Sequence, residues 1–184
     1  MKEYVIFDLD GTLVDSFQCI CRNVNKTLAY LEEPTCTAEQ FEKFRNWDLK
    51  RLFLYVVNAT KERISMKLFK SVFDKMHYYD CIDGVFVLEK TKKILDAELE
   101  VGTKIIVLTN KRQEIAERIC RELFPSDTFY AIVGRMDETP IKLSPSTVYR
   151  VNELMKDGIC KKYYGDSDTD KEMAALLQVE YEAV

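Results

Sequence analysis

The stretch YVIFDLDGT at residues 4–12 decides the fold, because an apolar run ends there in two carboxylates one residue apart. Residues 4–7 are enough for a buried strand, and Gly11 marks its end. Side chains alternate along a strand, so Asp8 and Asp10 would share a face if the strand continued that far. Two neighbouring acids repel each other unless a cation or a shared proton relieves them. The pair is therefore either a reactive site or two solvated turn residues.

Composition narrows the class of protein. The 184 residues, 47% of them hydrophobic and 32% charged, suit a soluble globular protein with one core domain and a small insert. A net charge of -4 without a long basic run disfavours nucleic-acid binding. No apolar stretch reaches the roughly 20 residues that span a bilayer, and the N-terminus lacks signal-peptide character, so we expect a cytoplasmic protein without membrane contact.

The segment 16–83 carries helical patterns only. Apolar residues recur at helical spacing from Phe17 to Leu28, and Thr37 with Gln40 forms a capping box that opens a second helix. Similar spacing over 49–56 and 60–76 predicts further helices. We therefore expect a small helical bundle here. His77, the only histidine, is expected at the surface or beside a hinge.

From Gly84 onward, strand and helix patterns alternate. We predict helices at 91–100, 111–123 and 170–177, and another that begins at Ser144-Pro145. Strands are predicted at 104–109, 129–133 and 161–164, with a last edge strand at 179–184. This alternation predicts an α/β fold with a doubly wound parallel sheet. Since the first strand must pair within that sheet, residues 1–15 and 84–184 form one predicted domain, and 16–83 form a helical insertion.

Reactive and phosphate-binding residue types follow four of the predicted strands. Ligands of open α/β sheets bind outside the carboxyl ends of the strands, so these side chains should converge. Several carboxylates with a lysine and a hydroxyl suit magnesium and a phosphate group, because Mg²⁺ prefers oxygen ligands and lysine neutralises phosphoryl oxygens. The residues in question are Asp8, Asp10, Thr12, Thr109, Asn110, Lys142, Asp166 and Asp170.

These motifs resemble the haloacid dehalogenase (HAD) superfamily, in the subgroup with a helical cap inserted after the first strand. The matching stretches are DLDGT at 8–12, LTN at 108–110, Lys142 and GDSDTD at 165–170, and phosphoglycolate-phosphatase-like hydrolases are the most similar. One departure is Leu143, where relatives usually carry proline. Asp10 disfavours dehalogenation, since that reaction needs no proton on the leaving group.

The resemblance implies a role for each residue. Asp8 would be the nucleophile that forms an aspartyl-phosphate, and Asp10 would be the general acid and base. Mg²⁺ would be bound by the Asp8 and Asp166 side chains and by the Asp10 backbone carbonyl. Asp170 would orient the metal's waters or Lys142. The phosphate would be held by Thr12, Thr109, Asn110 and Lys142.

The expected function is therefore Mg²⁺-dependent hydrolysis of a small phosphorylated metabolite. The alternatives are a phosphotransferase or sugar-phosphate mutase of the same superfamily, or a catalytically idle binding protein. Substrate choice would fall to the cap, where the helical pattern is interrupted. Either the residues there recognise an anionic substrate, or Trp47 packs in the core and its basic neighbours form a solvated helix face; the candidates are Asn46, Trp47, Lys50 and Arg51.

Overall fold

The computed structural model describes residues 1–45, 47, 49–61, 63–136 and 141–184. The chain divides into two compact units, one made of residues 1–15 and 86–184 and the other of residues 16–85. Among the described residues, no helix is long and apolar enough to cross a membrane. All six cysteines are free thiols.

The first unit is built on a five-stranded sheet in which every pair of neighbours is parallel. The order is β5-β4-β1-β6-β7, so the N-terminal strand lies at the centre. Residues 4–7 of β1 are fully buried because strands flank it on both sides. The strands are β1 (Lys2–Phe7), β4 (Lys104–Arg112), β5 (Ala131–Arg135), β6 (Gly158–Gly165) and β7 (Glu180–Ala183).

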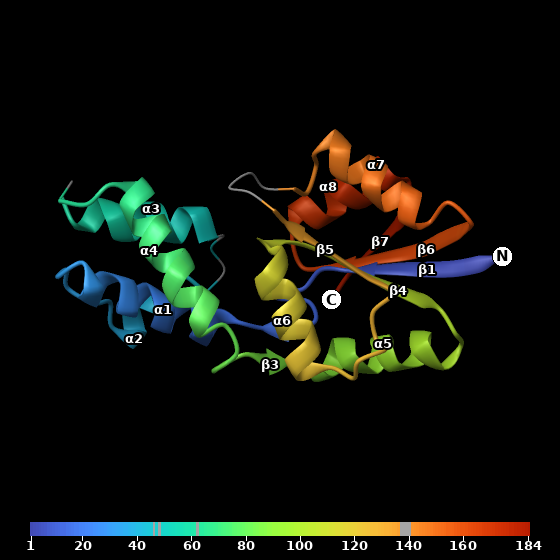
Figure 1. Ribbon diagram of the computed structural model, residues 1–184, viewed down its shortest axis with the longest axis horizontal. Coiled ribbons are helices and arrows are strands. Elements are labelled where there is room, and N and C mark those ends of the chain that lie inside the picture. The colour runs from blue at the N-terminus through green and yellow to red at the C-terminus, as the bar shows by residue number, and fades with distance from the viewer. Residues whose placement is uncertain (46, 48, 62, 137–140) are drawn as a thin grey trace. The chain divides into compact units, whose positions relative to one another are not determined.

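Helices cover both faces of this sheet (Figure 1), with α5 and α6 on one face and α7 and α8 on the other. A buried cluster on the second face joins Ile6 and Ile106 of the strands to Val151 of α7 and Met173 of α8. The predicted α/β, doubly wound fold is therefore confirmed. The bounds are α5 (Glu89–Glu100), α6 (Gln113–Leu123), α7 (Pro145–Leu154) and α8 (Asp168–Leu177).

Two details of the first unit differ from the sequence prediction. Strand β4 continues to Arg112 and α6 begins at Gln113, whereas the sequence pattern predicted a helix from Lys111. In addition, β2 (Val14–Asp15) and β3 (Phe86–Val87) form a two-stranded antiparallel ribbon that the sequence pattern did not predict. Strands of two residues are too short to show periodicity.

The second unit consists of α1 (Phe17–Tyr30), α2 (Ala38–Glu42), α3 (Leu49–Ala59) and α4 (Met66–Tyr79). The capping box of Thr37 and Gln40 is present at the start of α2. The core of this second unit includes three aromatic rings in mutual contact, with the ring centroid of Phe53 5.0 Å from that of Phe69 and 4.6 Å from that of Phe73. The predicted all-helical character of this segment is thus observed.

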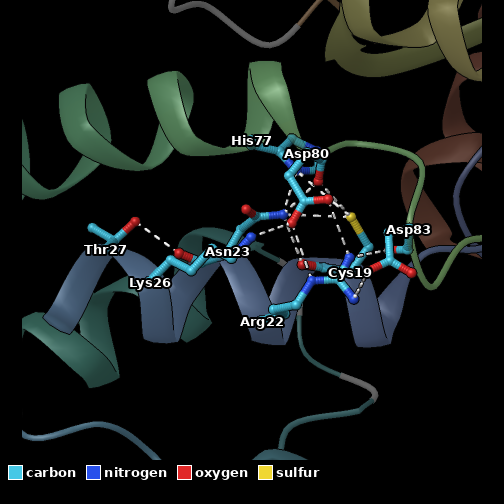
Figure 2. A network of polar contacts seen from close by, with 8 residues as sticks. All are labelled: Cys19, Arg22, Asn23, Lys26, Thr27, His77, Asp80 and Asp83. Atoms are coloured by element: carbon cyan, nitrogen blue, oxygen red, sulfur yellow. Dashed lines mark hydrogen bonds and ion pairs between the residues drawn. The ribbon is translucent and has the colours of Figure 1, made fainter. Parts of the chain in front are cut away.

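A polar network joins α1 to the C-terminal end of α4 (Figure 2). Asp80 accepts hydrogen bonds from Arg22 Nε at 3.1 Å and Lys26 Nζ at 2.6 Å. The Asn23 amide donates to the Asp80 carbonyl at 2.8 Å, and its nitrogen lies 3.3 Å from Nδ1 of His77. His77 is buried, so the expected surface position is wrong; it belongs to α4 and contacts Cys19 and Asn23 of α1, beside the segment that leaves this unit.

Candidate active site

The site begins where β1 ends. Asp8 is buried, and its N–H donates to the Tyr164 carbonyl of β6 at 2.9 Å, which fixes the backbone at this point. The chain then turns sharply, because the N–H groups of Leu13 and Val14 both donate to the Leu9 carbonyl, at 3.0 and 2.9 Å. The turn holds residues 8–12 beside the ends of the neighbouring strands.

Gly11 allows two segments to approach each other within this turn. Its φ of +82° lies in the left-handed region that favours glycine, and a Cβ atom at this position would overlap the Asp166 carboxylate. Asp166 follows β6 and is 155 positions later in the chain than Gly11. The absence of a side chain at Gly11 therefore lets Asp166 reach the loop that carries Asp8.

Lys142 joins two of the aspartates. Its ammonium group forms ion pairs with Asp8 and, at 2.6 Å, with Asp170, and all three side chains are almost fully buried. Burial lowers the pKa of Lys142, but the two carboxylates outweigh this effect and raise it overall. Burial raises the pKa of Asp8, with Asp170 acting in the same direction and Lys142 opposing it. Lys142 therefore carries a positive charge beside Asp8, the nucleophile candidate.

Asp170 is held by further contacts on both carboxylate oxygens. Oδ1 accepts from the Tyr163 hydroxyl at 2.9 Å as well as from Lys142, and Oδ2 accepts from the Ser167 N–H at 3.2 Å and from its hydroxyl. Ser167 and Asp170 also form the capping box that starts α8. These contacts suit a residue that orients Lys142.

Three carboxylates form a cluster that could bind a cation. Ligand oxygens of Asp8, Asp166 and Asp170 all lie within 4.8 Å of one another. The Asp166 side chain reaches solvent, and desolvation together with the Asp170 charge raises its pKa. Oxygen donors of this kind suit Mg²⁺. Since Asp170 already accepts four hydrogen bonds, the donors that best fit a metal are Asp8 and Asp166.

Asp10 takes a different partner. One of its carboxylate oxygens lies 3.2 Å from Nζ of Lys111, whose side chain is only 7% exposed, while that of Asp10 is 33% exposed. Sequence reasoning missed Lys111 because it placed this residue in the first turn of a helix. The available signal was its position directly after Thr109 and Asn110, at the carboxyl end of a strand.

The remaining phosphate-binding candidates lie at the same edge of the sheet. The buried Thr12 hydroxyl has no hydrogen-bond partner among the described residues. The Thr109 hydroxyl accepts from the Lys111 N–H at 3.1 Å and can still donate its own proton. The Asn110 side-chain oxygen accepts from the N–H groups of Ile141 and Lys142, both at 3.0 Å. Asn110 therefore anchors the loop that carries Lys142.

Leu143 explains how this loop departs from the family pattern. Its φ is +72°, a value that the proline ring cannot adopt. Proline at this position would prevent the turn that the loop makes here. The Leu143 N–H points to the sulfur of Met173 in α8 at 3.5 Å, which links the turn to the helix behind the site.

The cap candidates belong to the helical unit. Asn46 lies outside the described residues. Trp47 packs against the core of that unit, with its ring 4.6 Å from Phe44, and the Arg51 guanidinium lies 4.1 Å above the indole ring. Lys50 and Arg51 are exposed. Trp47 thus serves packing, while Lys50 and Arg51 remain candidates for contact with an anion.

Comparison with known proteins identifies relatives along nearly the full chain. Residues 5–184 match the haloacid dehalogenase-like hydrolase family. A protein of Caldanaerobacter subterraneus subsp. tengcongensis, assigned as pyrophosphatase PpaX, is 32% identical over 83% of this chain and 67% of its own length. Phosphoglycolate phosphatase of Aquifex aeolicus is 28% identical over 91% of this chain and 78% of its own length.

Solved structures show the same fold. The crystal structure of a predicted phosphoglycolate phosphatase from Haemophilus somnus superposes with a TM-score of 0.76 at 20% identity, covering 98% of this chain and 84% of that one. A HAD-superfamily hydrolase of subfamily IA from Geobacter sulfurreducens gives a TM-score of 0.75 at 19% identity, covering 100% and 86%.

Proposed function

The chain belongs to the haloacid dehalogenase-like hydrolase family and is a phosphatase, and on this premise we propose that it hydrolyses a small phosphorylated metabolite with Mg²⁺ through an aspartyl-phosphate. The observation that supports this most is the charge balance at the strand ends. Three carboxylates meet one ammonium group there, namely Asp8, Asp166 and Asp170 with Lys142. The excess of negative charge favours a divalent cation.

In this proposal the buried end of β1 supplies the nucleophile. Asp8 attacks phosphorus, and the bond from phosphorus to the leaving oxygen breaks while Asp10, which enters this step protonated, gives that oxygen its proton. Asp10 then takes a proton from the water that attacks the phosphorylated Asp8. Asp8, Asp166 and the Asp10 backbone carbonyl would hold Mg²⁺, which offsets the repulsion between carboxylate and phosphate. Thr12, Thr109, Asn110 and Lys142 would hold the phosphoryl oxygens.

The helical unit would act as a cap that selects the substrate. The core chemistry is common to many phosphomonoesters, so specificity must come from groups beside the phosphate. Lys50 and Arg51 are exposed cations and would favour a substrate with a second negative group. The relative from Aquifex aeolicus is named for phosphoglycolate, which has a carboxylate besides its phosphate. A small anionic phosphomonoester is therefore the proposed substrate class.

The test is phosphate release from a panel of phosphomonoesters, including p-nitrophenyl phosphate and phosphoglycolate. We expect turnover with Mg²⁺ and loss of activity with a chelator. Asp8→Asn should lower kcat by at least about 10³-fold, because an amide is a far weaker nucleophile than a carboxylate. Activity that survives Asp8→Asn would exclude the proposal. Transfer to an added alcohol in preference to water would instead favour the phosphotransferase alternative.

A further inference from the structure

Two buried lysines form ion pairs with three of the four aspartates of the site. Lys142 pairs with Asp8 and Asp170, whereas Lys111 pairs with Asp10. A role for Lys142 was expected from the family resemblance, whereas the pairing of Lys111 with Asp10 is seen only in the structure. Each lysine comes from a different segment, Lys111 from the end of β4 and Lys142 from the loop before α7.

The surroundings of Lys111 leave its ammonium group little freedom. Its side chain is 93% buried, since only 7% is exposed, and its Nζ lies 3.2 Å from Asp10 Oδ1. A buried ammonium group is stable only beside a compensating negative charge. The backbone at Lys111 is also fixed, because its N–H donates to the Thr109 hydroxyl at 3.1 Å. The cation is therefore fixed at both ends.

Asp10 needs such a partner more than Asp8 does. It lies beyond the end of β1 in the turn that contains Gly11, and its side chain is 33% exposed, compared with 6% for Asp8. A half-exposed carboxylate on a turn can adopt several rotamers, and only some of them direct an oxygen to the leaving group. An ion pair from the adjacent strand restricts that choice.

We propose that Lys111 is a positioning residue that holds Asp10 in the orientation for protonating the leaving oxygen: its ammonium group donates to Oδ1, and Oδ2 carries the proton that the leaving oxygen receives. The inference rests on the proposed phosphatase function and on the role of Asp10 in it. Asp10 serves two steps, but only the first depends on the leaving group, since a good leaving group departs without a proton, whereas an alkoxide requires one. The value of kcat/KM reports on the steps up to departure of the leaving group, so the later hydrolysis of phosphorylated Asp8 does not enter it. Loss of Lys111 should therefore affect substrates according to their leaving groups.

The experiment measures kcat and KM for p-nitrophenyl phosphate and for an alkyl phosphate, with Mg²⁺, in wild type and Lys111→Met. We expect kcat/KM for the alkyl phosphate to fall about 10- to 100-fold and kcat/KM for p-nitrophenyl phosphate to fall less than about 3-fold. Lys111→Arg should recover part of the loss. Lys104→Met is the matched control, since Lys104 is exposed at the opposite end of β4 and should change neither value.

A double-mutant cycle shows whether Lys111 acts through Asp10. In an Asp10→Asn background, Lys111→Met should cause no further loss with the alkyl phosphate. An equal fall for both substrates, a change confined to KM, or additive losses in the cycle would each overturn the inference while the phosphatase function stands. If Lys111→Met does not fold, Lys111→Gln and Lys111→Arg carry the same comparison. A wild type without phosphatase activity would overturn the proposed function and this inference with it.

Discussion

At the scale of single residues, Gly11 determines how close Asp166 comes to the nucleophile candidate. No side chain fits at position 11, because a Cβ atom there would overlap the Asp166 carboxylate. The same residue adopts a φ of +82°, so two independent constraints favour glycine. Gly102, after α5, has a similar φ of +79° but no atom within 4 Å of a Cβ. Substitution at Gly102 would therefore strain the backbone alone, whereas substitution at Gly11 would both strain the backbone and crowd Asp166.

We predict that Gly11→Ala lowers kcat by at least about 10²-fold, because it displaces a proposed metal ligand as well as straining the turn. Gly102→Ala should cost only about 1 kcal/mol of unfolding free energy, from the left-handed backbone, and leave kcat within 2-fold of wild type. Phosphate release and urea unfolding measure the two effects. Equal activity of both variants would show that the approach of Asp166 to Gly11 is unimportant.

At the scale of elements, the helical unit depends on the network between α1 and α4 (Figure 2). Hydrogen bonds from Lys26, and then from Arg22, lower the pKa of Asp80 against the opposing effect of burial. A carboxyl group with a lowered pKa in the folded state stabilises that state above its unfolded pKa of about 3.9. The stabilisation disappears as pH falls through the folded value.

We therefore predict that Asp80→Asn destabilises the protein at pH 7 by about 1 kcal/mol, and that this difference decreases as pH falls below the unfolded pKa of about 3.9. The measurement is urea unfolding followed by circular dichroism at several pH values. Glu39→Gln is the control, since the ion pair of Glu39 with Lys43 is mostly exposed and should contribute little. A difference that persists unchanged at pH 2 would contradict this explanation.

Elements with strong periodicity could be predicted from the sequence, and short or irregular ones could not. The buried run of β1 and the alternation after Gly84 were sufficient to predict the parallel sheet. The extension of β4 to Arg112 was missed because polar residues continue the strand past its apolar part. That boundary decides whether Lys111 belongs to a helix or to the site, so a small error in an element bound concealed a candidate functional residue.

At the scale of the whole chain, the candidate site is assembled from four segments that the sheet brings together. Asp8, Lys142 and Asp166 follow three different strands and Thr109 lies in the last part of a fourth, β4, yet parallel pairing places these strand ends at one edge. Sequence reasoning could predict this convergence because the rule for ligand sites in open α/β sheets depends only on topology. Which lysine pairs with which aspartate could be seen only in the structure, because the spacing of residues in the sequence does not determine how side chains pair.

The central claim is that Asp8 accepts the phosphoryl group. The most direct measurement stops turnover of p-nitrophenyl phosphate with acid, reduces the acyl phosphate with borohydride, and identifies the modified peptide by mass spectrometry. We predict conversion of Asp8 to homoserine, which forms only from a phosphorylated carboxyl group, and no conversion without substrate. Turnover with Asp8 unmodified, or with the label at another carboxylate, would contradict the account.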